Sequence, residues 1–274
     1  GYSGDLVSGA FFGKNSKSVG EGHKASGSAI QSGGTLNVVA DEVQIRGSKV
    51  KSKGDALVIS EKGQLSIEAA QSESSLSRRE NDSKLLGLIG HTREHQEQRK
   101  DVLKTDLSSD SDLRLASADE IRVIGSKLEA AKQLQLKAQK DITIGTAEQL
   151  HTSTSKQQDR GFTASAGQTQ NAGDGKPDSH QYSASVGYNV NTVDTRTSDK
   201  KQLASELNGG QVQLISENDV TVKGSHAAAN AGDVEVNAKN LNLVAAQNEQ
   251  SVVTTTTHSG GGLKVSGGID ALGS

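Results

Sequence analysis

The chain has 274 residues, a formal net charge of −3, no cysteine and no methionine. This near-balanced charge excludes the basic footprint of a nucleic-acid-binding protein, and the lack of cysteine excludes disulfides and thiolate metal sites. Only three Tyr and three Phe are present, which favours a narrow aliphatic core over a compact globule. No apolar run approaches the ~20 residues of a membrane-spanning helix. Without Met or a secretion signal, the chain is expected to be an internal piece of a longer protein.

Three segments, at residues 35–71, 112–149 and 211–247, share one pattern. In each segment, two apolar-x-apolar pairs precede a Gly-Ser step, and two further pairs follow it. The pairs are Leu36/Val38, Val43/Ile45, Leu57/Ile59 and Leu65/Ile67 in the first copy, Leu113/Leu115, Ile121/Val123, Leu134/Leu136 and Ile142/Ile144 in the second, and Val212/Leu214, Val220/Val222, Val234/Val236 and Leu241/Leu243 in the third. This alternation predicts short, half-buried strands.

The pairs also repeat at a longer spacing of 21 residues, as from Leu113 to Leu134. We therefore interpret each copy as two coils of a β-helix, with two strands in each coil. One coil buries about four large aliphatic side chains, worth roughly 1.5–3 kcal/mol each, whereas ordering its residues costs on the order of 1–2 kcal/mol apiece. A single coil is therefore unstable alone, and the coils are expected to stack.

The Gly-Ser steps are predicted to form a structural turn at a corner of the coil, because glycine adopts backbone angles that other residues resist. The residues of this turn are Gly47, Ser48, Gly125, Ser126, Gly224 and Ser225. Basic residues that precede the steps, such as Arg46 and Arg122, are interpreted as part of the repeat pattern rather than as a site.

Polar inserts separate the copies, at residues 1–34, 72–111, 150–210 and 248–274. Two runs still alternate, Phe162–Ala166 and Tyr182–Val190, which predicts a β-hairpin with its tip near residues 173–177. The other inserts are expected to be weaker hairpins, with disorder as the alternative for Arg93–Lys104. We expect the alternating hairpin to pack against the β-helix. Membrane contact is the alternative, because membrane-crossing strands alternate in the same way.

One motif matches a zinc-peptidase pattern, H-x-x-E-H from His91 to His95. Such a site needs an amphipathic helix, a third ligand and a dry cleft, whereas this motif lies in a charged insert without an apolar face. We interpret it as a solvated polar stretch. No catalytic residue, cofactor-binding residue, cofactor or metal site is therefore expected in the chain.

The blocks VQIRGSKVKSKGDALVISEKGQLSIEAA, IRVIGSKLEAAKQLQLKAQKDITIGTA and VTVKGSHAAANAGDVEVNAKNLNLVAA resemble the haemagglutinin repeat. This repeat belongs to the two-partner-secretion exoproteins of Gram-negative bacteria, among them filamentous haemagglutinin and the contact-dependent growth-inhibition effectors. The resemblance covers nearly the whole chain and is closest to the second repeat region of such proteins.

The resemblance implies an all-β fold, a right-handed parallel β-helix with hairpin or loop excursions between coil pairs. It also implies export through a dedicated outer-membrane transporter and action at the bacterial cell surface, against a target-cell surface or outer membrane. No nucleic-acid partner is expected.

Three functional hypotheses follow from the sequence. The leading one is a non-catalytic fibrous segment of a secreted or cell-surface exoprotein, which presents or delivers adjoining domains in adhesion or toxin delivery. The alternative is an outer-membrane-associating translocation or pore element of the haemolysin kind, and it rests on the alternating inserts. A β-helix enzyme that acts on polysaccharides is the least favoured, because no cluster of acidic residues on one strand face is evident.

Overall fold

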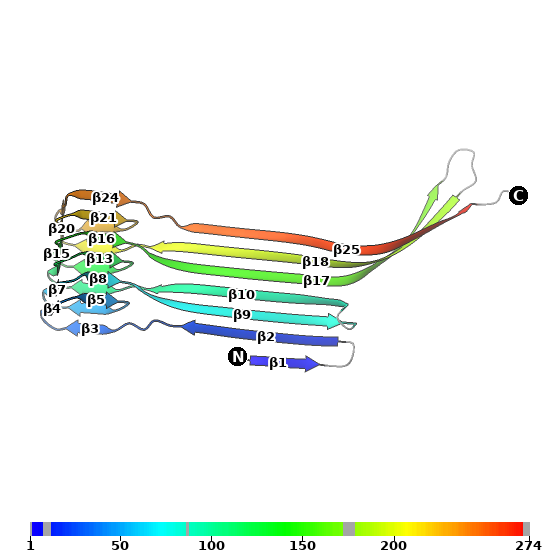
Figure 1. Cartoon of the computed structure of the whole chain (residues 1–274), viewed down its shortest axis with the longest axis horizontal. Helices are drawn as coiled ribbons and strands as arrows, with labels where there is room; N and C mark the ends of the chain where they lie inside the picture. The colour runs from blue at the N-terminus through cyan, green and yellow to red at the C-terminus, as the bar shows by residue number, and fades with distance from the viewer. Residues whose placement is uncertain (1, 8–11, 86–87, 172–178, 271–274) are drawn as a thin grey trace.

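The computed structural model describes residues 2–7, 12–85, 88–171 and 179–270. It consists of a stack of short-stranded coils and of one sheet of much longer strands that extends from one side of the stack (Figure 1). The prediction of an all-β fold built on a parallel β-helix, with hairpin excursions, is confirmed. The tip predicted near residues 173–177 lies outside the described residues.

Three parallel sheets of six strands form the stack. Sheet 1 contains β3 (Ala29–Ser32), β6 (Lys49–Ser52), β11 (Asp106–Ser109), β14 (Lys127–Ala130), β19 (Glu206–Gly209) and β22 (His226–Ala229). Sheet 2 contains β4 (Leu36–Ala40), β7 (Ala56–Ser60), β12 (Leu113–Ser117), β15 (Gln133–Ala138), β20 (Gln211–Ser216) and β23 (Val234–Asn237). Sheet 3 contains β5 (Val43–Arg46), β8 (Leu65–Glu68), β13 (Ile121–Ile124), β16 (Ile142–Gly145), β21 (Asp219–Lys223) and β24 (Asn240–Val244).

Each coil contributes one strand to each sheet, so a coil has three strands rather than the two that the sequence pattern predicts. The sequence pattern did not predict the strands of sheet 1, because the second inward-facing residue of each strand is small. In β6 and β11, a buried Val50 or Leu107 is followed by a buried Ser52 or Ser109. The pattern of two large apolar residues is therefore missing from these strands.

Strands of sheet 1 also shift the boundaries of the inserts. β3, β11 and β19 lie within residues 1–34, 72–111 and 150–210, which the sequence assigned to inserts. The coil pairs therefore begin about six residues earlier than predicted. The sequence did not reveal these strands, because a single large apolar residue does not produce an alternating pattern.

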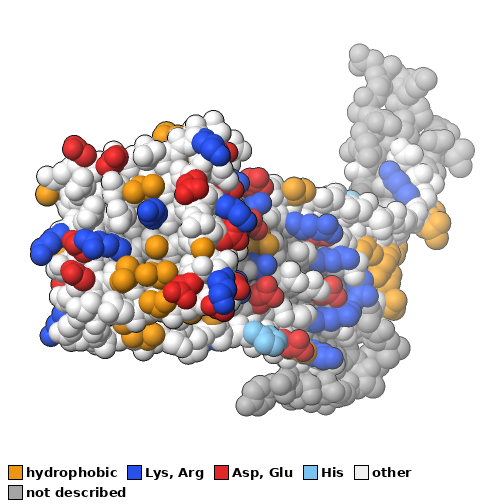
Figure 2. Space-filling view, turned by 60° about the vertical axis from the view of Figure 1, so that its left-hand side comes forward, with side chains coloured by type: hydrophobic (Ala, Val, Ile, Leu, Met, Phe, Trp, Pro, Cys, Tyr) orange, Lys and Arg blue, Asp and Glu red, His pale blue; other side chains and the backbone are white. Residues whose placement is uncertain are grey.

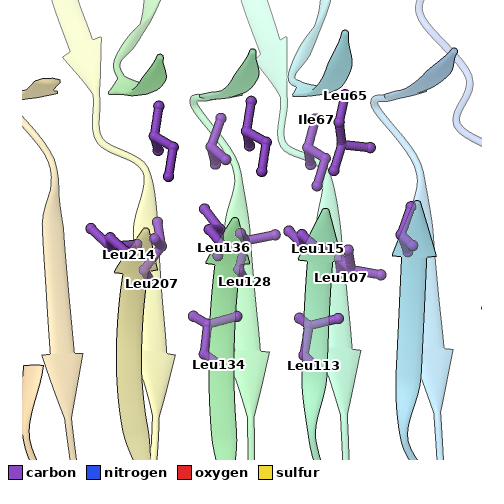
Figure 3. Packing of buried hydrophobic residues seen from close by; sticks show 14 of the residues in the cluster. Leu65, Ile67, Leu107, Leu113, Leu115, Leu128, Leu134, Leu136, Leu207 and Leu214 are labelled. Atoms are coloured by element: carbon purple, nitrogen blue, oxygen red, sulfur yellow. The ribbon is translucent and has the colours of Figure 1, made fainter. Parts of the chain in front are cut away.

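The core is a column of aliphatic side chains between the three sheets. Leu107, Leu128 and Leu207 of sheet 1 stack in register, and Leu115, Leu136 and Leu214 of sheet 2 form a second row (Figure 3). All six are at most 1 % exposed. Because each layer buries the layer below it, the stack gains stability with every added coil.

One predicted pair points the wrong way. In β7 the buried residues are Ala56, Val58 and Ser60, whereas Leu57 and Ile59 lie on the outer face and are only partly buried. A slip of one residue exchanges the two faces of a strand. The large apolar residues on both faces of β7 concealed this slip in the sequence.

Hydroxyl side chains line the corners of the coils. Ser52 Oγ donates to the Gly34 carbonyl at 2.7 Å, and Ser109 Oγ donates to the Gly54 carbonyl at 2.8 Å. At another corner, the buried Ser205 Oγ donates to the Gly145 carbonyl at 2.6 Å. Each hydroxyl thus adds a hydrogen bond to a corner carbonyl. The carbonyls of Gly34 and Gly145 also accept one from the backbone N–H groups of Gly54 and Gly125.

Glycine occupies the corner between sheet 3 and sheet 1 in alternate coils. Gly47, Gly125 and Gly224 adopt φ values of 55°, 59° and 53°, a left-handed conformation that favours glycine. A Cβ atom added to them would also lie 2.5, 2.3 and 2.2 Å from the Cβ atoms of Ala70, Ala147 and Ala246, respectively. The backbone angle and the lack of space both require glycine.

The long sheet takes its strands from the inserts. Its order is β1 (Tyr2–Val7), β2 (Phe12–His23), β9 (Ala70–Lys84), β10 (Ile89–Leu103), β17 (Ala147–Asn171), β18 (Ser179–Leu203) and β25 (Glu249–Asp270), all antiparallel to their neighbours. Residues 93–103, for which disorder was the alternative, lie in β10. Hairpins that are far apart in the sequence are thus joined edge to edge.

Charges alternate along the outer face of sheet 1. Lys49, Asp106, Lys127 and Glu206 are successive partners in register on four neighbouring strands. Lys104 Nζ donates to Glu206 Oε1 at 3.0 Å. This hydrogen bond is the main cause that holds the pKa of Glu206 below its usual value, against an opposing effect of burial.

We expect Gly125→Ala to destabilise the β-helix by about 2–5 kcal/mol, because the left-handed backbone angle and the contact with Ala147 are both penalised. Urea unfolding monitored by circular dichroism measures this change. Gly161→Ala is the matched control, since a Cβ atom there meets nothing within 4 Å and alanine favours a strand over glycine. Equal stability of Gly125→Ala and the wild type would contradict the proposed role of the corner.

We expect the stabilising effect of Glu206 to depend on pH. Because the folded pKa of Glu206 is lowered, its contribution is present above the unfolded pKa of about 4.3. The contribution is lost as the pH falls through the folded pKa. The difference in urea midpoint between the wild type and Glu206→Gln should therefore shrink on acidification. In a Lys104→Gln background the same comparison should vary much less with pH, and an unchanged pH dependence would refute the pairing.

Candidate functional site

The long sheet is a single layer whose strands β17, β18 and β25 extend farthest from the stack (Figure 1). β17 and β18 pair without interruption from Ala147↔Leu203 to Asn171↔Ser179. β25 pairs with β18 along Glu249–Asp270. Since paired residues of neighbouring strands lie on the same face, the register determines which side chains share a face.

One face of this far end is apolar, and we call it the aromatic face. Three rows across β17, β18 and β25 form it. They are Phe162, Tyr188 and Gly261, then Ala164, Val186 and Leu263, then Ala166, Ala184 and Val265. The rings of Phe162 and Tyr188 meet edge to face, with centroids 5.2 Å apart. Two of the three described aromatic rings on this face thus form one cluster. The third, Tyr182, lies one row beyond Ala166 and Ala184.

These apolar side chains are open to solvent. Val186 is 58 % exposed, Leu263 81 % and Val265 72 %. A contiguous exposed apolar patch commonly marks an interaction site. The sequence-based expectation that this hairpin packs against the β-helix is wrong, because the far end of β17 and β18 lies away from the coils (Figure 1).

The opposite side of the same strands, which we call the reverse face, is polar. Thr163, Ser165, Ser183 and Ser185 alternate with the apolar residues. Ser165 Oγ and Ser185 Oγ are hydrogen-bonded at 2.8 Å. The far end of the sheet is therefore amphipathic, with one side suited to an apolar environment and the other to water.

The His91–His95 motif does not form a metal site. It lies in β10, a strand, so that His91 and His95 lie on the reverse face and Glu94 on the aromatic face. His91 instead hydrogen-bonds Asp159, which is the main cause that lowers the pKa of that carboxyl group. Among the described residues, no group of three His, Cys, Asp or Glu side chains could hold a metal ion.

A second carboxylate of the reverse face, Glu97, accepts a hydrogen bond from Arg99. That bond is the largest cause of its lowered pKa, and the nearby charges of His151 and His95 add to it. Glu97 and Arg99 thus form an ion pair on an exposed sheet. The surface hollows near the far end, such as the one lined by Thr163, Val186 and Gly260, are open to solvent.

Sequence reasoning found the alternation of β17 and β18 but missed the contribution of β25. Leu263 and Val265 alternate over only two positions after the glycines at 260–262. Their place beside Val186 and Ala184 depends on a register that the coil stack sets. The sequence signal that could have revealed Leu263 and Val265 is a short alternating run that follows each coil pair.

No described helix is long and apolar enough to cross a membrane. No solved structure matches the chain. Two curated proteins, both named Hemolysin, do match. One, from Proteus mirabilis, is 26 % identical over 242 residues, and the other, from Serratia marcescens, is 29 % identical over 249 residues. The matches cover 88 % and 90 % of this chain but only 15 % of each relative.

The chain therefore spans a small part of the length of these relatives. The specific resemblance to contact-dependent growth-inhibition effectors stays a prediction. A family model described as the hemagglutinin repeat matches residues 10–90 and 86–262. Together with the three repeated coil pairs, this match shows that the chain belongs to the haemagglutinin-repeat family of two-partner-secretion exoproteins.

Proposed function

We propose that this chain is a non-catalytic segment of a secreted exoprotein, and that its long sheet attaches the protein to a lipid membrane through the aromatic face. The single observation that carries this proposal is the amphipathic far end of β17, β18 and β25. Leu263 and Val265 are more than two-thirds exposed on one face, while small polar residues fill the other.

The physics of a lipid surface suits such a sheet. A one-sided apolar surface lies in the plane of the interface, with its apolar side chains among the acyl chains and its polar side in water. Each large aliphatic side chain that moves from water into the acyl region makes the free energy of binding more favourable by roughly 1.5–3 kcal/mol. Tyr182 and Tyr188 suit the same place, since aromatic rings with a polar end concentrate at membrane interfaces.

The names of the relatives agree with this proposal. Both matching proteins are named Hemolysin, a name that implies damage to cell membranes. The β-helix then acts as a rigid support, because its stacked coils fix the strands of the long sheet at one side (Figure 1).

A second candidate function is the presentation or delivery of adjoining domains. The relatives extend far beyond the matched segment, because this chain covers only 15 % of each relative. A stack of coils is a suitable spacer, because each coil contacts only its neighbours and the stack is rod-like. Export through a dedicated outer-membrane transporter and action on a target-cell surface belong to this same proposal.

We expect the fragment to float with phosphatidylcholine vesicles in a density gradient. The double variant Val186→Ser/Leu263→Ser should lower vesicle binding on the order of tenfold or more, because two immersed side chains become polar. Both residues are exposed, so the fold should be retained, and circular dichroism checks this.

The matched control is Val39→Ser, which changes a 54 % exposed valine on the β-helix instead. Its binding should equal that of the wild type. Failure of the wild type to float, or an equal loss in the control, would overturn the proposal.

A further inference from the structure

A band of basic side chains lies next to the apolar rows, also on the aromatic face. One row across the sheet runs through Lys17, Arg79, Glu94, Lys156 and Asp194, which are successive partners in register. The same face carries two further arginines that flank this row, Arg160 on β17 and Arg196 on β18. Figure 2 shows Lys and Arg side chains gathered on the sheet between the coils and a patch of hydrophobic side chains.

The two faces differ in charge over this stretch. On the aromatic face of strands β2 to β25, four rows, from Thr154 to Arg160 of β17, hold five basic and two acidic residues. These are Lys17, Arg79, Lys156, Arg160 and Arg196 against Glu94 and Asp194. The three interleaved rows of the reverse face hold three of each, namely Lys14, Arg78 and Arg93 against Glu80, Asp82 and Asp159. Only the aromatic face carries an excess of positive charge.

A hollow of about 250 Å³ lies within the band, lined by Arg79, Thr92, Glu94, Lys156, Gln158 and Arg160. Arg79 pairs with Glu94 at 3.3 Å, and Arg160 Nη2 donates to Thr92 Oγ1 at 3.3 Å. The Lys156 side chain is exposed, and Arg160 Nε is buried without a hydrogen-bond partner in the structure. The hollow is thus rich in positively charged hydrogen-bond donors and has room for an oxyanion.

The hollow is close to the apolar rows. Arg160 precedes Phe162 by two residues on the same face, a separation of about 7 Å along a strand. When Phe162 enters the acyl region, Arg160 lies at the depth of the headgroups, and the rest of the band faces the membrane surface. Guanidinium groups bind phosphate oxygens in a fork geometry.

We propose that this basic band binds the phosphate-bearing headgroups of anionic phospholipids, so that the long sheet selects negatively charged membranes. This inference rests on the proposed membrane attachment, and it names the lipid class. The apolar rows supply binding that does not depend on lipid charge, whereas the band adds a preference. Basic residues at an anionic lipid surface each strengthen binding on the order of fivefold.

The test compares flotation with vesicles of phosphatidylcholine alone and with vesicles that also contain phosphatidylglycerol. The wild type should bind the anionic vesicles more tightly, and added salt should reduce the difference through screening. Lys156→Gln/Arg160→Gln should lose on the order of 25-fold in binding to the anionic vesicles and retain its binding to phosphatidylcholine.

The matched control is Arg78→Gln/Arg93→Gln, which removes the same charge from the reverse face and should keep the preference. Equal binding of the wild type to both vesicles, or an equal loss in the control, overturns the lipid preference alone. The proposed function fails in a different way, when the wild type binds neither vesicle or when Val186→Ser/Leu263→Ser leaves phosphatidylcholine binding unchanged.

Discussion

The close contact between a corner glycine of one coil and an alanine of the next is the constraint on which the rest of the structure depends. Gly47, Gly125 and Gly224 close the corner of every other coil. In the adjacent coil, the chain leaves the stack at Ala70, Ala147 or beyond Ala246 to form the long sheet. Because these departures are stacked at one corner, the hairpins emerge side by side and pair with each other.

The sequence revealed those parts of the fold that repeat. Aliphatic alternation predicted sheets 2 and 3, and the Gly-Ser step recurs in all three copies. The sequence did not reveal sheet 1, because Ser52 and Ser109 occupy inward positions where a large apolar residue was expected. A serine is favourable there because its hydroxyl bonds a corner carbonyl. Hydrophobic patterns cannot detect a position whose role is to satisfy backbone hydrogen bonds.

The candidate site was only partly predictable for a different reason. Alternation within β17 and β18 is local, so the sequence disclosed it. The place of Leu263 beside Val186, and of Lys156 beside Glu94, is set by pairing between segments far apart in the chain. That pairing follows from which coils are neighbours in the stack. The faces of the long sheet could therefore be assigned only once the coil register was known.

The spacing of coils explains why the excursions follow every second coil. Stacked coils and paired strands share one separation, about 4.7–4.9 Å. A hairpin adds two strands to the long sheet, and two coils add the same height to the stack. β9 with β10, and β17 with β18, each follow two coils. A hairpin after every coil would crowd the long sheet, and one after every third coil would leave a gap in its hydrogen bonding. The closed Gly-Ser corner in alternate coils thus keeps the height of the β-helix equal to the width of the long sheet. A continuous aromatic face with its basic band requires these two dimensions to be equal.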